Sequence, residues 1–277
     1  MKRDNKAVEE ITAMLERGVE NMIDGEEYEE YLRFAAKFHQ YSANNCMLIF
    51  LQKPDASMVA GFKAWQTKFK RNVKKGEKGI KILAPCVHKT VKIEKDANGN
   101  DVEREIRFVT YRVTTVFDIS QTEGEPVPEL CKELKGTVDR YAEIVERLEK
   151  FAPVPVTFEK ISGGALGYYN HVEKRIAVKE GMSEAQTIKT LIHEIAHSLM
   201  HDTETGEEKE ADRQTKEVQA ESVAFTVCSY LGLDTSDYSF GYIVGWSKGR
   251  EPKELHESMA AIQKTSKAVI EGLSSAA

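Results

Sequence analysis

Residues 190–201 read TLIHEIAHSLMH, with two histidines four positions apart and a glutamate directly after the first. Apolar residues recur through this stretch at helical spacing, at Ile188, Leu191, Ile192, Ile195, Ala196 and Leu199. Such a stripe predicts a helix that buries one face. His193 and His197 then project from the same side. Ser183 and Gln186 predict a capping box where this helix begins.

The histidine pair has the spacing of two ligands of a tetrahedral Zn²⁺ site. Glu194 stands beside His193, where a carboxylate base takes the proton of the water that attacks a carbonyl. The pattern therefore predicts a zinc metalloendopeptidase with one Zn²⁺ per chain, His193 and His197 as ligands, and Glu194 as the catalytic residue. The alternative is a pair of surface histidines that bind no metal.

A catalytic zinc site needs a third protein ligand. The metzincin pattern would place Gly at 200 and His at 203, whereas this chain has Met200 and Thr203, which excludes that class. A second helix, expected at about 210–231, carries Glu217 and Glu221 on or beside its apolar face. Charged side chains on a buried face need a partner, which a metal or a ligating histidine provides. Helical geometry alone does not choose between the two glutamates.

The order of these residues resembles the glutamate-zincins. In that class, a glutamate ligand is followed four residues later by an acid that orients a ligand histidine. The gap of 20 positions from His197 to Glu217 is also similar. The resemblance implies Glu217 as the metal ligand and Glu221 as its outer support, with the reverse assignment left open.

Other residues near the predicted metal site also have expected roles. His201 lies about 12 Å along the helix axis from His193, so we expect it to be structural or to support a ligand. Residues 175–178, RIAV, are either an exposed edge strand that a substrate peptide extends or an ordinary sheet strand. His171 and His256 are expected in solvent. The candidates for stabilising the oxyanion are Tyr168, Tyr169 and Tyr238.

The composition is that of a globular protein. The chain has 277 residues, enough for two domains, with 41% hydrophobic and 30% charged residues. No apolar run reaches the roughly 20 residues that span a bilayer, and the first 15 residues lack the pattern of a signal peptide. We therefore expect a cytoplasmic protein with no membrane partner. Reduced thiols are expected at the four scattered cysteines, Cys46, Cys86, Cys131 and Cys228.

The net charge of −6 is unevenly distributed. Residues 61–93 contain ten Lys or Arg and one acid, Glu77, a net charge of +9, which leaves −15 for the remainder. Lysines for phosphates and aromatic rings for bases are the ingredients of single-strand binding. In the alternative, the aromatics at 62, 65 and 69 are core residues under a solvated lysine face. The residues expected to contact DNA are Trp65, Lys68, Lys70, Arg71, Lys74, Lys75, Lys78 and Lys81.

The remaining pattern predicts an α+β fold with two domains. Helices are expected at about 5–22 and 26–38, and a third, capped by Ser42, ends before Pro54. Residues 80–120 predict strands and a long hairpin around the turn DANGN, and two shorter helices are expected to finish the chain. The predicted units are a DNA-binding domain at 1–122, a linker at 123–130 and a metallopeptidase domain at 131–277.

Three segments of the first half resemble a known family. YSANNCMLIFLQKPDASMVAGFKAWQ (41–66), VKKGEKGIKILAP (73–85) and VFDISQTEG (116–124) are similar to the N-terminal single-stranded-DNA-binding domain of ArdC-type antirestriction proteins. The resemblance implies that Tyr41, Ser42 and Asn45 contact DNA, while Asn44 stands where the family often has arginine. GYYN, HEIAHSLMH and EVQAE are similar to the zinc metallopeptidase domain usually fused to it.

The resemblance implies a protein of a mobile genetic element that protects incoming DNA from restriction during conjugation. One alternative is a DNA-stimulated protease that acts on DNA-bound or crosslinked proteins, as Spartan-like enzymes do. Another is a non-catalytic single-stranded-DNA-binding protein with a structural metal. A third, a protease that cleaves repressors, is disfavoured by the presence of the first domain.

Overall fold

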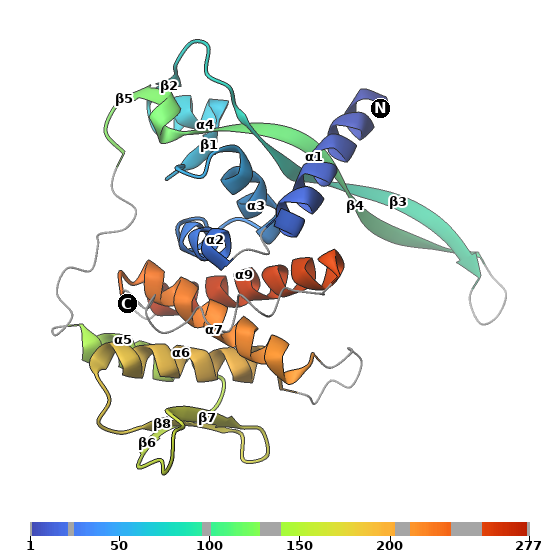
Figure 1. Ribbon diagram of the computed structural model, residues 1–277. Coiled ribbons are helices and arrows are strands. Elements are labelled where there is room, and N and C mark those ends of the chain that lie inside the picture. Colours follow the sequence, from blue (N-terminus) through green and yellow to red (C-terminus); the bar gives the residue numbers. More distant parts are fainter. Residues whose placement is uncertain are drawn as a thin grey trace.

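The computed structural model describes residues 2–21, 25–95, 101–127, 140–202, 211–233 and 251–275. Its mixture of helices and strands confirms the predicted α+β class (Figure 1). The first half contains α1 (Lys2–Asn21), α2 (Gly25–Lys37), α3 (Ala43–Gln52), β1 (Val59–Gly61), α4 (Phe62–Thr67), β2 (Arg71–Val73), β3 (Ile80–Lys95), β4 (Asp101–Asp118), η1 (Ile119–Gln121) and β5 (Thr122–Gly124). The second half contains α5 (Tyr141–Phe151), β6 (Val156–Glu159), β7 (Gly167–Asn170), β8 (Arg175–Lys179), α6 (Glu184–Met200), α7 (Arg213–Tyr230) and α9 (Pro252–Ser275).

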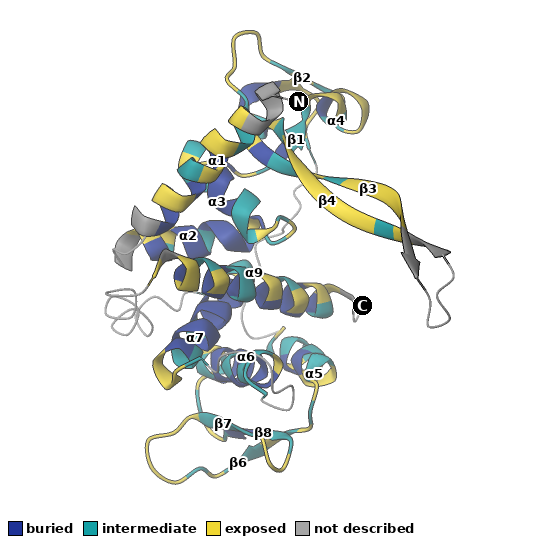
Figure 2. Cartoon of the chain, turned by 90° about the vertical axis from the view of Figure 1, so that its right-hand side faces the viewer, coloured by how far each residue is buried: buried dark blue, intermediate teal, exposed yellow. Residues whose placement is uncertain are grey.

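Strands β3 and β4 form one long antiparallel ribbon, paired from Ile80↔Val116 to Lys95↔Asp101. Strand β1 adds to β4, which gives the order β1-β4-β3. The inner end of the ribbon is buried at Ile80 and Ile82, whereas Val87 further out is 65% exposed. The ribbon therefore leaves the body of the protein, as Figure 2 shows. The predicted hairpin is confirmed.

Helix α3 lies along β3 and is held there by two side-chain amides. Asn45 donates to the carbonyl of Leu83 and accepts from its amide, both at 2.8 Å. Gln52 bonds in the same way to the carbonyl and amide of Lys81, at 2.8 and 2.9 Å. Each amide thus pairs with the strand backbone as a neighbouring strand would. Ser42 caps the helix by accepting from the Asn45 amide.

Asp118 joins the end of β4 to the loop before β1. One carboxylate oxygen accepts from the amides of Ser57 and Met58, at 2.8 and 3.1 Å, and the other from Ser120 at 2.9 Å. Burial alone would raise the pKa of Asp118, but these hydrogen bonds outweigh it and hold the pKa below its usual 3.8. Gln121 completes a capping box with Asp118.

Replacing Asp118 with asparagine is expected to lower the free energy of unfolding by about 2–4 kcal/mol at neutral pH. The amide loses the charge that strengthens three buried hydrogen bonds. Because the folded pKa is depressed, this contribution is complete above the unfolded value of 3.8 and is lost as pH falls through the folded pKa. Urea unfolding at several pH values measures it, with Asp55→Asn as an exposed control. A difference that stays constant well below pH 3.8 would contradict the assignment.

The second half contains a three-stranded sheet with the order β6-β8-β7. Strand β8 pairs in parallel with β6 and antiparallel with β7, so it is the central strand. The interpretation of residues 175–178 as an exposed edge is therefore wrong. The apolar residues of β8 explain why it is the central strand, since Ile176, Ala177 and Val178 are all fully buried. Strands β6 and β7 are the two outer strands.

Helices α7 and α9 lie between the helices of the first half and helix α6 (Figures 1 and 2). Gln263 of α9 donates to the carbonyls of Phe38 and Tyr41, and a hydrogen bond joins Tyr28 of α2 to Ser222 of α7 at 3.0 Å. Buried residues of both halves form one continuous core. Of the two shorter helices expected to finish the chain, the described part contains one, α9, which is longer than expected at 24 residues. Residues 234–250 lie outside the described part.

The first half extends beyond the predicted boundary at residue 122. Glu123 and Gly124 belong to β5 and pair with Asn72 and Arg71 of β2, so they are sheet residues rather than linker. Residues 128–130 of the predicted linker lie outside the described residues. None of the described helices has the length and hydropathy needed to cross a membrane.

Candidate metal centre

Helix α6 carries three of the predicted site residues, with His193 and His197 facing α7 and Glu194 facing β7. Ser183 caps it by accepting from the Gln186 amide, while the Gln186 side chain bonds to Thr190 instead of completing a capping box. His193 and His197 are half-buried, and Glu194 is 7% exposed. The apolar stripe is fully buried at Leu191, Ile192 and Ile195, which fixes the rotation of the helix.

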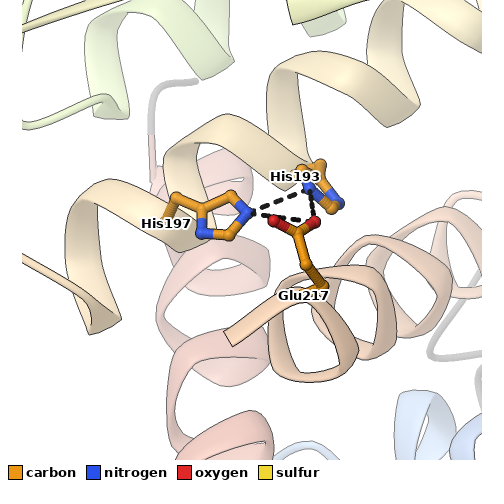
Figure 3. A group of neighbouring side chains, drawn as sticks. All are labelled: His193, His197 and Glu217. Atoms are coloured by element: carbon orange, nitrogen blue, oxygen red, sulfur yellow. Dashed lines mark hydrogen bonds and ion pairs between the residues drawn. The ribbon is translucent and has the colours of Figure 1, made fainter. Parts of the chain in front are cut away.

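Glu217 of α7 meets the two imidazoles (Figure 3). Its Oε2 lies 3.5 Å from His193 Nε2 and 3.8 Å from His197 Nε2, and the two Nε2 atoms are 3.0 Å apart. Donor atoms at the corners of a tetrahedron around Zn²⁺, with bonds of about 2.0–2.1 Å, are separated by about 3.3–3.4 Å. The three side chains therefore fit a divalent cation held by two nitrogens and one carboxylate.

Glu221, one turn further along α7, bonds to the outer side of His193. Its Oε2 lies 3.2 Å from His193 Nδ1. The other oxygen forms an ion pair with Lys189, which is 7% exposed on α6. A carboxylate that accepts from Nδ1 leaves the Nε2 lone pair directed at Glu217. The structure thus gives the two glutamates different positions, Glu217 inside the cluster and Glu221 behind it.

The electrostatics of the cluster favour positive charge. Burial alone would lower the pKa of His193, but hydrogen bonds to Glu217 and Glu221 raise it to about 9. Hydrogen bonds to His193 and His197 hold the pKa of Glu217 far below its usual value. A divalent cation between these groups would take the place of that proton.

Glu194 lies beneath β7. Burial raises the pKa of its carboxyl, although a hydrogen bond from the Tyr169 amide partly offsets this. A Cβ at Gly167 would come within 2.7 Å of Thr190 Cγ2 and 3.2 Å of Glu194 Cγ, so only glycine allows β7 to approach this closely. A buried carboxyl with a raised pKa is suited to accept and return a proton near neutral pH.

The cluster opens into a cleft of about 1570 Å³, lined by β7, α6 and the first turns of α7. The Tyr168 hydroxyl donates to Glu159 and accepts from Arg175, both at 2.8 Å, so it is already used within the sheet. The Tyr169 hydroxyl is buried, and Tyr238 lies outside the described residues. The structure therefore gives neither described tyrosine hydroxyl the position of an oxyanion donor.

Two family models match the chain. Residues 2–117 match the N-terminal domain of anti-restriction factor ArdC, and residues 152–239 match the IrrE N-terminal-like domain of the peptidase M78 family. The first half of the chain is thus similar to an ArdC-type N-terminal domain and the second half to an M78 peptidase domain, and we call them the ArdC-type domain and the M78-type domain.

Individual relatives agree with this pair of domains. An uncharacterized protein of Bacillus anthracis, pXO2-81, is 28% identical over 87% of this chain. The chain spans about half the length of that relative, 46%. The metal-free crystal structure of the antirestriction ArdC protein from the R388 plasmid has a similar fold, with a TM-score of 0.53 and 20% identity over 85% of this chain and 86% of that one. The Mn(II)-bound structure of that protein gives 0.53 and 19% over 84% and 85%.

The residues Tyr41, Ser42, Asn45 and Trp65, which were expected to contact DNA, bond to other parts of the ArdC-type domain. Trp65 is fully buried and its Nε1 donates to the Phe117 carbonyl at 2.8 Å, so its ring is not available to stack on a base. Tyr41 donates to the carbonyl of Val59 at 3.0 Å. Ser42 and Asn45 cap and attach α3, as described above. The structure gives these four residues packing roles, which corrects the expectation of direct DNA contact for Trp65.

The seven basic residues expected to contact DNA divide into two groups. Arg71 donates to Thr122 and to the carbonyls of Gly124 and Glu125, and Lys74 donates to the carbonyl of Ser120. Lys70 lies 3.9 Å from Glu125. The remaining four have exposed side chains on α4, β3 and the glycine turn between them, at Lys68, Lys75, Lys78 and Lys81.

Several residues near the metal centre of the M78-type domain were missed or misjudged from the sequence. Lys189 could have been found, because a lysine beside a buried stripe needs an acidic partner. His201 lies 2.9 Å from His197.

His256, expected in solvent, bonds to Asn44 of α3 at 2.7 Å and thus joins the two domains. His171 is exposed, as predicted.

Proposed function

We propose that this protein is a metal-dependent endopeptidase that also binds single-stranded DNA. The observation that carries the peptidase is the meeting of His193, His197 and Glu217 beside a buried glutamate, Glu194, at the floor of an open cleft. Two imidazoles and a carboxylate are the ligand set of catalytic Zn²⁺ sites, and we propose one Zn²⁺ per chain. The Mn(II)-bound ArdC structure supports a divalent ion in this fold.

The residues have separate roles in this proposal. A divalent cation, when bound, supplies Lewis acidity that polarises a carbonyl and makes water more acidic. Glu194 accepts the proton of the attacking water and returns it to the leaving amine. Glu217 completes the ligand set, while Glu221 holds His193 by its Nδ1–H and Lys189 fixes the other oxygen of Glu221.

The substrate class follows from the strand above the site. Strand β7 is one of the two outer strands of its sheet, and it lies at the site, because its Tyr169 amide donates to Glu194. An extended peptide that pairs with β7 would bring its backbone to Glu194. We therefore assign substrate pairing to β7 instead of the central strand β8, and propose a protein or peptide as the substrate.

Cleavage of an unfolded protein by the metal-loaded chain tests this proposal. We expect slow cleavage with Zn²⁺ or Mn²⁺, none after chelation, and recovery when metal is restored. The same assay with and without single-stranded DNA measures whether DNA changes the rate. Metal-loaded protein that cuts neither unfolded proteins nor proteins bound to single-stranded DNA would contradict the peptidase assignment.

The proposed DNA contacts are the exposed lysines of the ArdC-type domain. Lys75→Ala and Lys78→Ala together are expected to weaken binding to single-stranded DNA and to reduce the slope of log affinity against log salt by about 0.7 per lysine. Fluorescence anisotropy at several salt concentrations measures both quantities. Lys264→Ala, an exposed lysine of α9, is the control. Wild-type affinity that does not change with salt would contradict phosphate binding.

The biological role proposed is that of the similar R388 protein, antirestriction. Such a role belongs to a protein of a mobile genetic element that acts in the cytoplasm on DNA entering by conjugation. Transfer of a plasmid into restricting and non-restricting recipients tests it, because protection should appear only in the former. The second candidate, cleavage of proteins crosslinked to DNA, is favoured by the same pair of domains and predicts protection from crosslinking agents instead.

A further inference from the structure

A line of hydrogen bonds runs from the metal cluster to α9. His197 Nδ1 lies 2.9 Å from His201 Nδ1, and His201 Nε2 lies 2.9 Å from Gln219 Oε1. The Gln219 amide donates to Ser258 Oγ at 3.0 Å. We propose that His201 is a positioning residue that presents His197 to the metal, and that Gln219 and Ser258 hold His201 in place. This inference rests on the metal site proposed above.

The direction of the protons follows from the last link. Gln219 uses its amino group to donate to Ser258, so its oxygen accepts a hydrogen bond from the Nε2–H of His201. The neutral imidazole of His201 then offers a lone pair at Nδ1. His197 must donate its Nδ1–H to that lone pair, and its Nε2 lone pair is left facing Glu217. Only this tautomer of His197 can bind a cation at Nε2.

The same contacts fix the orientation of the His197 ring. His201 caps the end of α6, where its amide bonds to the His197 carbonyl at 2.9 Å, so the two residues are joined through backbone and side chain. Gln219 and Ser258 are 8% and 4% exposed, which shields the line from water. A buried line of this kind has little freedom to rotate.

The two ligand histidines are therefore held in different ways. His193 donates to a carboxylate, Glu221, whereas His197 donates to a neutral imidazole. The support of His193 is Glu221 of α7, which is held in turn by Lys189 of α6. The support of His197 continues through α7 to Ser258 on α9, the helix whose His256 and Gln263 bond to the first domain. Ser258 lies outside both ranges matched by the family models.

A series of substitutions at His201 shows whether this residue acts as a hydrogen-bond acceptor for His197 or only packs against it. In asparagine the side-chain oxygen is two bonds from Cβ, the same separation as Nδ1 in histidine. His201→Asn therefore keeps an acceptor at about the same position. Glutamine places its polar group one bond further out, and leucine has none. The readout is the affinity of the purified full chain for Zn²⁺, measured by competition with a chelating dye. His88→Leu, an exposed histidine on the ribbon, controls for adventitious zinc binding.

We expect His201→Asn to bind Zn²⁺ within about threefold of wild type, and His201→Gln and His201→Leu to bind about 10–100-fold more weakly. Melting temperatures of the chelated proteins control for folding, and the Asn and Gln variants alone suffice if the Leu variant does not fold. Equal affinities for all variants, or an Asn variant as weak as Leu, would overturn the inference. A wild-type chain that binds no Zn²⁺ would overturn the proposed metal site as well.

Ser258→Ala tests the last link. It should weaken Zn²⁺ binding a few-fold, because Gln219 loses the acceptor that orients it. Ala260→Ser, two residues further along α9, is a matched control that changes one hydroxyl elsewhere on the same helix. An unchanged affinity in Ser258→Ala would overturn the part of the inference that involves α9.

Discussion

Glutamine in place of Glu194 is expected to abolish peptide cleavage while the bound metal stays in place. The amide has the size of the carboxylate but cannot accept a proton from water, and general base catalysis contributes about 10²–10⁴-fold. Glu194 does not contribute an atom to the cluster of His193, His197 and Glu217, so the loss should appear in kcat and not in metal content.

Two measurements on the same protein preparation check this. Elemental analysis gives the metal per chain, and cleavage of an unfolded protein gives the rate. Glu180→Gln, which changes an exposed glutamate three residues before the α6 N-cap Ser183, is the control that removes one charge nearby. Retained cleavage in Glu194→Gln would rule out Glu194 as the base. Loss of metal would instead give it a role in holding the site.

The second large effect is expected at Glu217, whose replacement by glutamine should weaken metal binding more than the same change at Glu221. Glu217 Oε2 faces both Nε2 atoms, whereas Glu221 bonds to the far side of His193. Loss of an outer carboxylate weakens metal binding by about 10–100-fold. Loss of a ligand leaves two donors and should exceed that range.

Calorimetry or dye competition with Zn²⁺ ranks the two variants. Glu221→Gln also removes the negative partner of buried Lys189, so its melting temperature should fall as well. Glu217 is more exposed and should change the stability of the metal-free protein less. A larger loss of affinity in Glu221→Gln would reverse the assignment of the two glutamates.

The sequence predicted those features that depend on local spacing. The stripe of α6 is a property of one helix, and so is the common face of His193 and His197. The ribbon followed from alternating residues around a turn. The run of apolar residues in β8 also indicated a strand covered on both faces, which is how the edge interpretation could have been avoided.

Features that depend on contacts between distant segments were not predictable in this way. Trp65 and Asn45 have residue types suited to DNA, but their partners, Phe117 and Leu83, lie 52 and 38 positions away. The choice between Glu217 and Glu221 depends on how α7 is rotated against α6. The support of His197 passes through Gln219 and Ser258, two residue types that carry no spacing signal of their own.

The central place of α9 has a consequence for synthesis on the ribosome. Helices α1 and α3 are complete by Gln52, whereas α9, which packs against both, begins at Pro252. At roughly 5–20 residues per second, about 10–40 s pass before that helix is made. During this interval the apolar faces of the early helices lack their final partner. Nascent chains stalled before residue 252 should therefore bind chaperones and resist protease poorly, with both domains becoming protected together once α9 has emerged.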